Sequence, residues 1–432
     1  MQSRPCVNAA PSLDDPTAAR TAGAQWLSVA LIDARNRTLR WLQHFESLGR
    51  LHGAGPAAEH AQPCAGALPL PAQLIGRAAW FQEYWVARHV QRLRGAAADP
   101  QGPRLASIEP QADRWFARLG PQPDPVSGPS RGTPEPLPDG AALRPYLAAT
   151  LETTLELLAG TPDTDTGLHV FRLALAHEDR LAERLAALGD TIGVAAPPPE
   201  VGLGVPAPSR TPREPLWIPA RRFRPGIPRG TPGLVPALEQ AGEEEAVPEF
   251  EIDAQAVSWA RFAPFAEEGG YDDPRWWTED GWAWVQRFGR RAPRGVEQLR
   301  GGVVLARFGR LVRAPAGEAV AHVNVHEAQA WCCWAGRRLP LEVEWELAAS
   351  TAVSRGFLWG DVREWVAGRA AAWPGAPCQP VAGCPLPAAA AGRRVLRGAS
   401  SWTSPRDRQR TARVGVHGAR DDLFCGFRSC SA

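Results

Sequence analysis

A proline-rich segment divides this sequence and limits how the rest of the chain can fold. Residues 194–248 contain thirteen prolines, and a proline inside a helix or a central strand removes a backbone hydrogen bond. Long regular elements are therefore excluded here, and we expect a linker that grades into a second domain. The length of 432 residues also favours two domains, because a single core rarely grows that large.

The residues before this segment show the apolar spacing that is typical of helices. We expect a flexible polar tail over residues 1–22 and then a helical domain over residues 23–193. Its helices are predicted from about residue 26 to 49, 73 to 93, 141 to 158 and 168 to 188. Four helices with long connections favour a bundle.

The residues after the segment have a different pattern. The linker is assigned to residues 194–215 and the second domain to residues 216–432, with strand-like runs at 216–219 and 247–253 and a short helix at 258–265. Most of the 18 tryptophans lie in this half. These features favour a loop-rich α+β fold held together by aromatic packing, so the fold class is a helical bundle followed by an α+β domain.

Composition excludes several classes of function. The net charge is only +2, and all 48 basic residues are arginines that alternate with acidic residues, which disfavours a nucleic-acid partner. The sequence has no apolar run of membrane-spanning length and no signal-peptide pattern at its start, so we expect a cytoplasmic protein without a membrane partner. The eight cysteines lack paired C-x-x-C spacing and are interpreted as reduced thiols without a catalytic role.

Four motifs of the second half resemble the signatures of one fold. They are HEAQAWCCWAGRRLPLEVEWELAA at residues 326–349, GDVREW at 360–365, RGASSW at 397–402 and GFR at 426–428. In this order they resemble the formylglycine-generating-enzyme fold, a C-type-lectin-like α+β module. True formylglycine-generating enzymes need a cysteine pair, which the matching residues 401–413 lack. That activity is therefore disfavoured.

With a DinB-like four-helix bundle in front, the chain resembles the ergothioneine-type sulfoxide synthases and the related selenoneine synthases. WFQEYW at residues 80–85, GGYDDPRWW at 269–277 and DDLFCGFRSC at 421–430 are similar to the selenoneine synthase branch. The resemblance implies a non-haem iron(II), O2-dependent oxidoreductase that forms a C–Se or C–S bond on the imidazole of hercynine. The implied partners are hercynine and a selenium or sulfur donor.

The resemblance also implies three histidine ligands for the iron, and the matching positions here are Arg77, His177 and Leu181. Only His177 keeps a donor, because a guanidinium stays protonated and a leucine has no lone pair. Glu178 and Glu183, on the same predicted helix, are candidate replacements. Iron(II) is therefore expected from the family but not from this set of residues, and the catalytic residues stay unassigned.

An alternative hypothesis is a catalytically inactive relative that lacks iron and acts as a binding or scaffold protein. Arg77 would then form an ion pair with Glu83 or Glu178 at the vacated position. His177 would be a hydrogen-bonded residue of the bundle core. A less favoured route to a metal site is an inward-folded His44, His52 or His60.

The resemblance further implies substrate-binding residues in the second domain. By position these are Arg397, Trp402, Asp421, Asp422 and Arg428, in the role of pocket walls or scaffold. The stretch RVGV at residues 413–416 lacks the larger and polar side chains that related synthases carry there. This loss weakens the expected recognition of a zwitterionic imidazole substrate.

Overall fold

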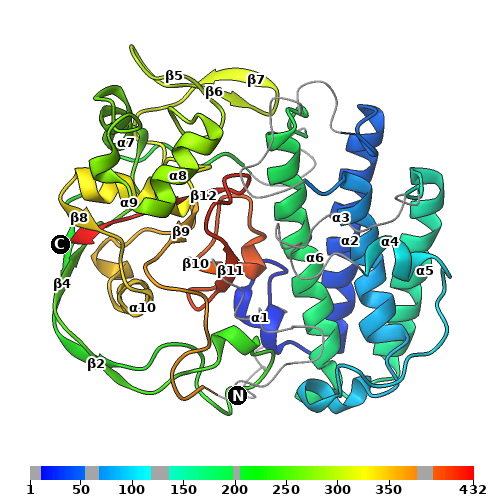
Figure 1. Cartoon of the computed structure of the whole chain (residues 1–432). Helices are drawn as coiled ribbons and strands as arrows, with labels where there is room; N and C mark the ends of the chain where they lie inside the picture. The colour runs from blue at the N-terminus through cyan, green and yellow to red at the C-terminus, as the bar shows by residue number, and fades with distance from the viewer. Residues whose placement is uncertain (1–10, 54–67, 118–135, 198–204, 377–392) are drawn as a thin grey trace, which may run out of the picture.

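The structure is a computed structural model that describes residues 11–53, 68–117, 136–197, 205–376 and 393–432. A helical part and a mixed part of helices and small sheets lie side by side (Figure 1). The helical part comprises α1 (Pro16–Thr21), α2 (Ala24–Ser47), α3 (Pro71–Gln82), η2 (Glu83–Ala87), η3 (Arg92–Ala97), α4 (Ala112–Phe116), α5 (Gly140–Ala159) and α6 (Asp165–Thr191).

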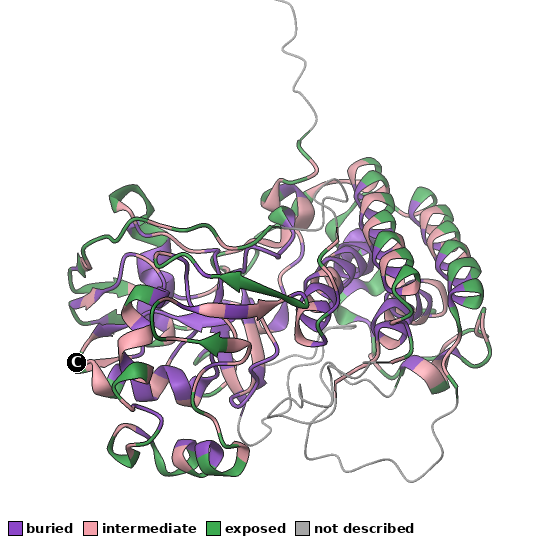
Figure 2. Cartoon of the chain, turned by 90° about the horizontal axis from the view of Figure 1, so that it is seen from above, coloured by how far each residue is buried: buried purple, intermediate pink, exposed green. Residues whose placement is uncertain are grey.

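The four long helices α2, α3, α5 and α6 pack as a bundle, as the apolar spacing predicts. On α2 the buried residues Leu27, Leu31, Ala34 and Trp41 recur at helical spacing, and Figure 2 shows such buried stripes turned towards the interior. Side-chain caps fix where α5 and α6 begin, because Asp139 and Thr164 accept hydrogen bonds from backbone N–H groups of the first turn.

Two segments of the helical part differ from the sequence prediction. The helix expected over residues 73–93 changes at Gln82 into the π-helix η2, which begins at Glu83, and the helical hydrogen bonding ends at Ala87. The tail expected over residues 1–22 contains helix α1, which is capped by Asp15. Gln409 of the second part donates to the Pro16 carbonyl at 2.6 Å, so this end of the chain is held by a contact that no local pattern reveals.

The second part contains small sheets, helices and turns. Its helices are α7 (Trp259–Glu267), α8 (Glu279–Phe288), α9 (Val325–Trp334) and α10 (Glu342–Thr351), with single turns η5 (Ala237–Glu239), η6 (Pro274–Trp276), η7 (Val353–Arg355) and η8 (Pro405–Asp407). Its strands are β1 (Leu216–Ile218), β2 (Arg221–Phe223), β3 (Glu245–Val247), β4 (Phe250–Ile252), β5 (Val296–Gln298), β6 (Val304–Arg307), β7 (Arg310–Arg313), β8 (Arg337–Arg338), β9 (Arg363–Trp365), β10 (Arg393–Arg397), β11 (Arg413–His417), β12 (Cys425–Phe427) and β13 (Cys430–Ser431).

The strands form four small sheets among the described residues. The sheet nearest the bundle has the order β11-β10-β9-β12, in which β9 and β12 are parallel and the other pairs antiparallel. A second sheet has the order β1-β4-β13-β8, and the two remaining sheets are β2-β3 and β5-β6-β7. The strands near residues 216–219 and 247–253, the helix near 258–265 and the α+β character are therefore as predicted.

Buried tryptophans and arginines hold the second part together. Trp345 donates to the Glu364 carboxylate at 2.8 Å, and Trp365 donates to the Val323 carbonyl at 2.7 Å. Arg428 binds both oxygens of the same Glu364 carboxylate. The motifs that resemble the formylglycine-generating-enzyme fold thus contribute much of the scaffold of this part.

The predicted linker is shorter on its C-terminal side than expected. Arg210 donates its backbone N–H to Gly317 at 2.9 Å, and its guanidinium forms an ion pair with Asp361. Residues 205–215 therefore pack on the second part, although the sequence assigned them to a linker. Their prolines suit an extended segment of this kind.

No described helix is both long and apolar enough to cross a bilayer. The described cysteines are Cys332, Cys333, Cys425 and Cys430, and all four are free thiols.

Helix α6 joins the two parts through carboxylates at helical spacing. Asp179 binds Arg406 through two hydrogen bonds of 2.7 and 3.0 Å. One turn later, Glu183 binds Arg363 of β9 at 2.9 and 2.6 Å and also accepts from Ser400 and Thr403. Asp190 follows on the same face, where it accepts from the backbone of Phe308 and pairs with His322. These buried contacts fix α6 against the second part.

We predict that the Glu183–Arg363 pair behaves as a buried ion pair. Arg363→Met alone should lower the free energy of unfolding by about 3–5 kcal/mol, because it leaves a buried carboxylate without its cation. Adding Glu183→Leu should recover a large part of this loss. Urea unfolding of the two single variants and the double variant measures the coupling.

The exposed pair Arg222–Glu244 supplies the control, since both side chains are largely in solvent. Glu244→Gln should leave the urea midpoint unchanged. Equal losses from the single and the double variant at Glu183 and Arg363 would contradict the prediction.

A second prediction concerns Glu327, which caps α9 from inside the second part. Its carboxylate accepts from Asn324 N–H at 2.9 Å and from the Tyr271 hydroxyl at 2.6 Å. Burial, aided by the charge of Asp421, raises the pKa of Glu327 from 4.5 to about 7. The folded protein therefore keeps a proton between these pH values that the unfolded chain releases, so stability falls as the pH rises through this window.

The free energy of unfolding of the parent should therefore fall relative to that of Glu327→Gln when the pH is raised from 5 to 8. The difference between the two proteins should change by on the order of 3 kcal/mol in favour of the variant. The measurement is urea unfolding at both pH values. Glu344→Gln changes the equivalent cap of α10, whose carboxylate binds Arg338. This control should not gain stability at the higher pH, and an equal effect of Glu327→Gln at both pH values would refute the prediction.

Candidate functional site

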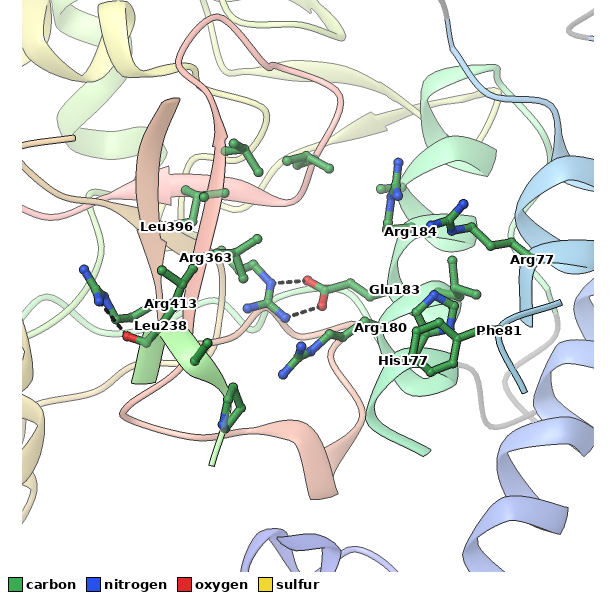
Figure 3. A pocket seen from close by; sticks show the side chains of 18 of the residues that line it. Arg77, Phe81, His177, Arg180, Glu183, Arg184, Leu238, Arg363, Leu396 and Arg413 are labelled. Carbon is green, nitrogen blue, oxygen red and sulfur yellow. Dashed lines mark hydrogen bonds and ion pairs between the residues drawn. The ribbon is translucent and has the colours of Figure 1, made fainter. Parts of the chain in front are cut away.

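A cavity of about 660 Å³ lies between the bundle and the second part. Helices α3 and α6 form one wall, and the strands β10 and β11 with the turn η5 form the opposite wall (Figure 3). The wall from the bundle is rich in aromatic side chains, whereas the wall from β10 and β11 is largely apolar. The lining of the cavity includes Arg77, Trp80, Phe81, Tyr84, Trp85, Asp113, His177, Arg180, Leu181, Glu183, Arg184, Glu239, Arg363, Arg393, Leu396, Arg413, Val414, Val416 and Phe424.

The structure brings together the three positions at which the resemblance implies iron ligands. Arg77, His177 and Leu181 all line the cavity. His177 stacks on Phe81 with ring centroids 3.9 Å apart. Its Nδ1 atom is buried without a hydrogen-bond partner among the described residues. Burial holds the pKa of His177 well below its ordinary value, and the positive charges of Arg77, Arg180 and Arg184 lower it further.

The two carboxylates proposed as replacement ligands are occupied by other groups. Glu178 points into the bundle, where it accepts from Arg35, Thr38 and Gln82 at distances between 2.7 and 3.1 Å. Glu183 borders the cavity, but Arg363 binds both of its oxygens. A metal ion at His177 would have to displace one of these arginines from a buried ion pair.

The expected ion pair between Arg77 and Glu83 or Glu178 is absent from the described structure. Glu83 instead accepts from the hydroxyls of Tyr146 and Ser107 and from the backbone of Ile108, and Glu178 is bound by Arg35. Arg77 donates to the Phe116 carbonyl at 2.8 Å and lies over the Trp80 ring. The predicted ion pair was wrong because other groups of the protein donate hydrogen bonds to both carboxylates.

The residues at this position do not fit an iron centre. Iron(II) that activates dioxygen needs several nitrogen or oxygen donors on one side, and here a cation and an alkyl group stand beside a single imidazole. No group of three or more histidine, cysteine or carboxylate side chains that could hold a metal occurs in the described ranges. The candidate His44 contacts the Ala195 carbonyl at 2.6 Å, His52 is exposed, and His60 lies outside the described residues.

The charged lining of the cavity is mainly positive. Six arginines stand against three carboxylates, and each of these carboxylates is already bound by an arginine: Asp113 by Arg88, Glu183 by Arg363 and Glu239 by Arg20. Among the lining arginines, Arg180 pairs with Asp407 and Arg413 with Glu342, and Arg393 donates to the Gly415 carbonyl. Arg77 and Arg184 form no ion pair with a carboxylate of the described structure.

Arg77 and Arg184 stand near each other on the bundle wall (Figure 3). Burial lowers the pKa of each to about 10, and the charges of Arg420 and Arg77 also lower the pKa of Arg184, whereas Asp422 raises it. Both remain cations at neutral pH, because a pKa near 10 is well above 7. The site therefore concentrates uncompensated positive charge where the resemblance implies a bound cation.

The five residues implied as substrate-binding do not line this cavity. Arg397 is fully buried against Glu346, and Arg428 against Glu364. Asp421 is bound by Arg290 and Arg294, and Asp422 by Arg420. Trp402 stacks on Phe424 at the boundary with the bundle, with ring centroids 5.6 Å apart.

Sequence reasoning missed Arg180 and Arg184. Both lie on the stripe of α6 that also carries His177, at spacings of three and seven residues. The helical spacing was a usable signal for both. The absence of a carboxylate partner of Arg184 among the described residues was not, because it depends on how arginines and carboxylates from distant parts of the chain pair; Arg180 itself pairs with Asp407.

Comparison with known proteins relates the second part to a described domain family. Residues 205–375 match the sulfatase-modifying factor enzyme 1-like domain, which agrees with the sequence motifs and with the packing of residues 205–215.

The similarity to hercynine oxygenases covers a larger share of the chain than this domain does. A hercynine oxygenase of Mycolicibacterium smegmatis is 31% identical over 53% of this chain and 53% of its own length, and one of Mycolicibacterium thermoresistibile is 28% identical over 78% and 69%. An inactive C-alpha-formylglycine-generating enzyme 2 of Mus musculus is 34% identical over 35% of this chain and 50% of its own length. The chain thus spans about half to two thirds of the length of these relatives, and the two hercynine oxygenase similarities support the resemblance to ergothioneine-synthase-like proteins.

Proposed function

We propose that this chain is a hercynine-oxygenase-related protein that binds a small molecule in the cavity between its two parts and does so without iron. The observation that carries the proposal is the side-chain set at the expected ligand positions, Arg77, His177 and Leu181, which all line one cavity. The preceding bundle is proposed to be a DinB-like unit, which would retain the position of the family's site without its metal donors.

The contacts around the cavity support binding rather than iron-dependent oxygenation. A repelling guanidinium at one ligand position and an alkyl group at another remove two donors. Both nearby glutamates are held by arginines at 2.8 and 2.6 Å. The cavity nevertheless remains large enough for a small organic molecule, in the range of ordinary ligand pockets.

Anaerobic reconstitution with iron(II) tests this proposal. The purified parent should retain no stoichiometric iron, because one imidazole alone holds it weakly. The variant Arg77→His/Leu181→His should bind about one iron per chain, since it restores three imidazoles on facing helices. Metal analysis after desalting gives the stoichiometry, and thermal unfolding confirms that each variant is folded.

His177→Ala in the Arg77→His/Leu181→His background is the matched control and should remove the iron again. If the parent itself bound one iron per chain and lost it on His177→Ala, the proposal would be wrong.

A second candidate function is an iron(II)- and O2-dependent enzyme that forms a C–Se or C–S bond on hercynine. The similarity to two hercynine oxygenases favours it. It requires metal donors from elsewhere in the chain, because Arg77 and Leu181 supply none. The assignment to the selenoneine branch rests on sequence motifs alone. Consumption of hercynine by the iron-loaded parent, in the presence of oxygen and a thiol or selenol donor, would establish this candidate over the first.

A further inference from the structure

We propose that Arg77 and Arg184 form a clamp for an anionic group, a carboxylate or a phosphate, carried by an aromatic small molecule that occupies the cavity between the two parts. This inference rests on the proposed function, because it needs the ligand position to be free of iron. It adds the chemical class of the ligand and the residues that select it.

Arg184 is the first element of the clamp. It projects from α6, is partly buried and borders the cavity. It forms no hydrogen bond or ion pair with any described residue, and Asp422, the carboxylate whose charge raises its pKa, is bound through both oxygens by Arg420. A guanidinium in such a place has unused donors, which a bound anion would satisfy.

Arg77 is the second element. It reaches from α3 towards α6 (Figure 3), and among the described residues its guanidinium donates one hydrogen bond, to the Phe116 carbonyl. That bond uses one of the five N–H groups of a guanidinium. Two cations held close together in a partly dry cavity repel each other, and an anion between them removes this repulsion.

The walls beside the clamp suit an aromatic body. Trp80, Phe81, Tyr84 and Trp85 line the cavity from the bundle side, and Phe424 does so from the second part. The ring of Trp80 stacks on Tyr84 with centroids 4.9 Å apart, which gives a flat and rigid surface. An aromatic ligand would thus pack against these rings while its anionic group meets the two arginines.

The same charges disfavour a cationic ligand. Arg180, Arg363, Arg393 and Arg413 also border the cavity, but each is held by a partner, so the uncompensated positive charge is that of Arg77 and Arg184. The lining carboxylates are already paired, so they offer little to a cation. Neutral molecules gain only from the apolar walls and should bind more weakly than anions of the same shape.

Binding of matched probes to the iron-free parent tests the clamp. Phenyl phosphate and benzoate are the anionic probes, and benzamide is the neutral probe of similar shape. We expect at least one anionic probe to bind roughly tenfold or more tightly than benzamide, by isothermal titration calorimetry, because charge-assisted hydrogen bonds add to the ring contacts. Preference for phenyl phosphate would assign a phosphate ligand, and preference for benzoate a carboxylate.

Arg184→Gln and Arg77→Gln should each weaken binding of the preferred anion by roughly tenfold or more and leave benzamide binding unchanged. Arg222→Gln, on exposed β2, is the matched surface control and should change neither. Because a variant can lose its fold, the thermal unfolding midpoint is measured with and without probe. A folded variant should lose the ligand-induced rise in the midpoint.

Equal affinity of benzamide and both anions, or full anion affinity in the two arginine variants, would overturn the clamp. These results leave the proposed function intact if the parent still fails to hold iron. Conversely, iron in the parent overturns the proposed function whatever the probes do. The Arg77→His/Leu181→His variant tests the clamp and the proposed function together, since it should gain iron and lose anion affinity.

Discussion

Buried ion pairs between α6 and the second part are the contacts on which the rest of the structure depends. Asp179 and Glu183 lie one turn apart and receive Arg406 and Arg363 from the second part. Such pairs cost desolvation, and the full set of partners offsets it: Glu183 is bound by a guanidinium and two hydroxyls. They determine the separation of α6 from β10 and β11, and therefore the width of the cavity.

Three stripes of α6 serve three purposes. Glu178 faces the bundle interior and pairs with Arg35, and Asp179 and Glu183 face the second part. The stripe with His177 and Arg184 faces the cavity. Each carboxylate that lines the cavity forms an ion pair with an arginine of another element. The positive charge of Arg184 on the cavity stripe is therefore not neutralised by these carboxylates. The electrostatics of the site thus follow from the way in which the two parts are held together.

Much of the fold could be predicted from the sequence, because it depends on local patterns. Apolar spacing gave the four bundle helices, and the tryptophan-rich motifs gave the character of the second part. The partners of the carboxylates could not be predicted. Arg35 meets Glu178 across 143 residues of chain, and Arg363 meets Glu183 across 180. No spacing rule reaches over such distances, and the expected ion pair of Arg77 with Glu83 or Glu178 was wrong because Tyr146 donates to Glu83 and Arg35 to Glu178.

The side chains around the cavity are consistent with one another. At the positions where the resemblance implies metal ligands, Arg77 and Leu181 offer no donor to a metal cation on the bundle side. On the facing side, Val414 and Val416 of β11 present alkyl groups. Uncompensated guanidinium groups in a partly buried cavity cost free energy of desolvation. An anion that binds between Arg77 and Arg184 offsets this cost, so their positive charge is consistent with a binding site.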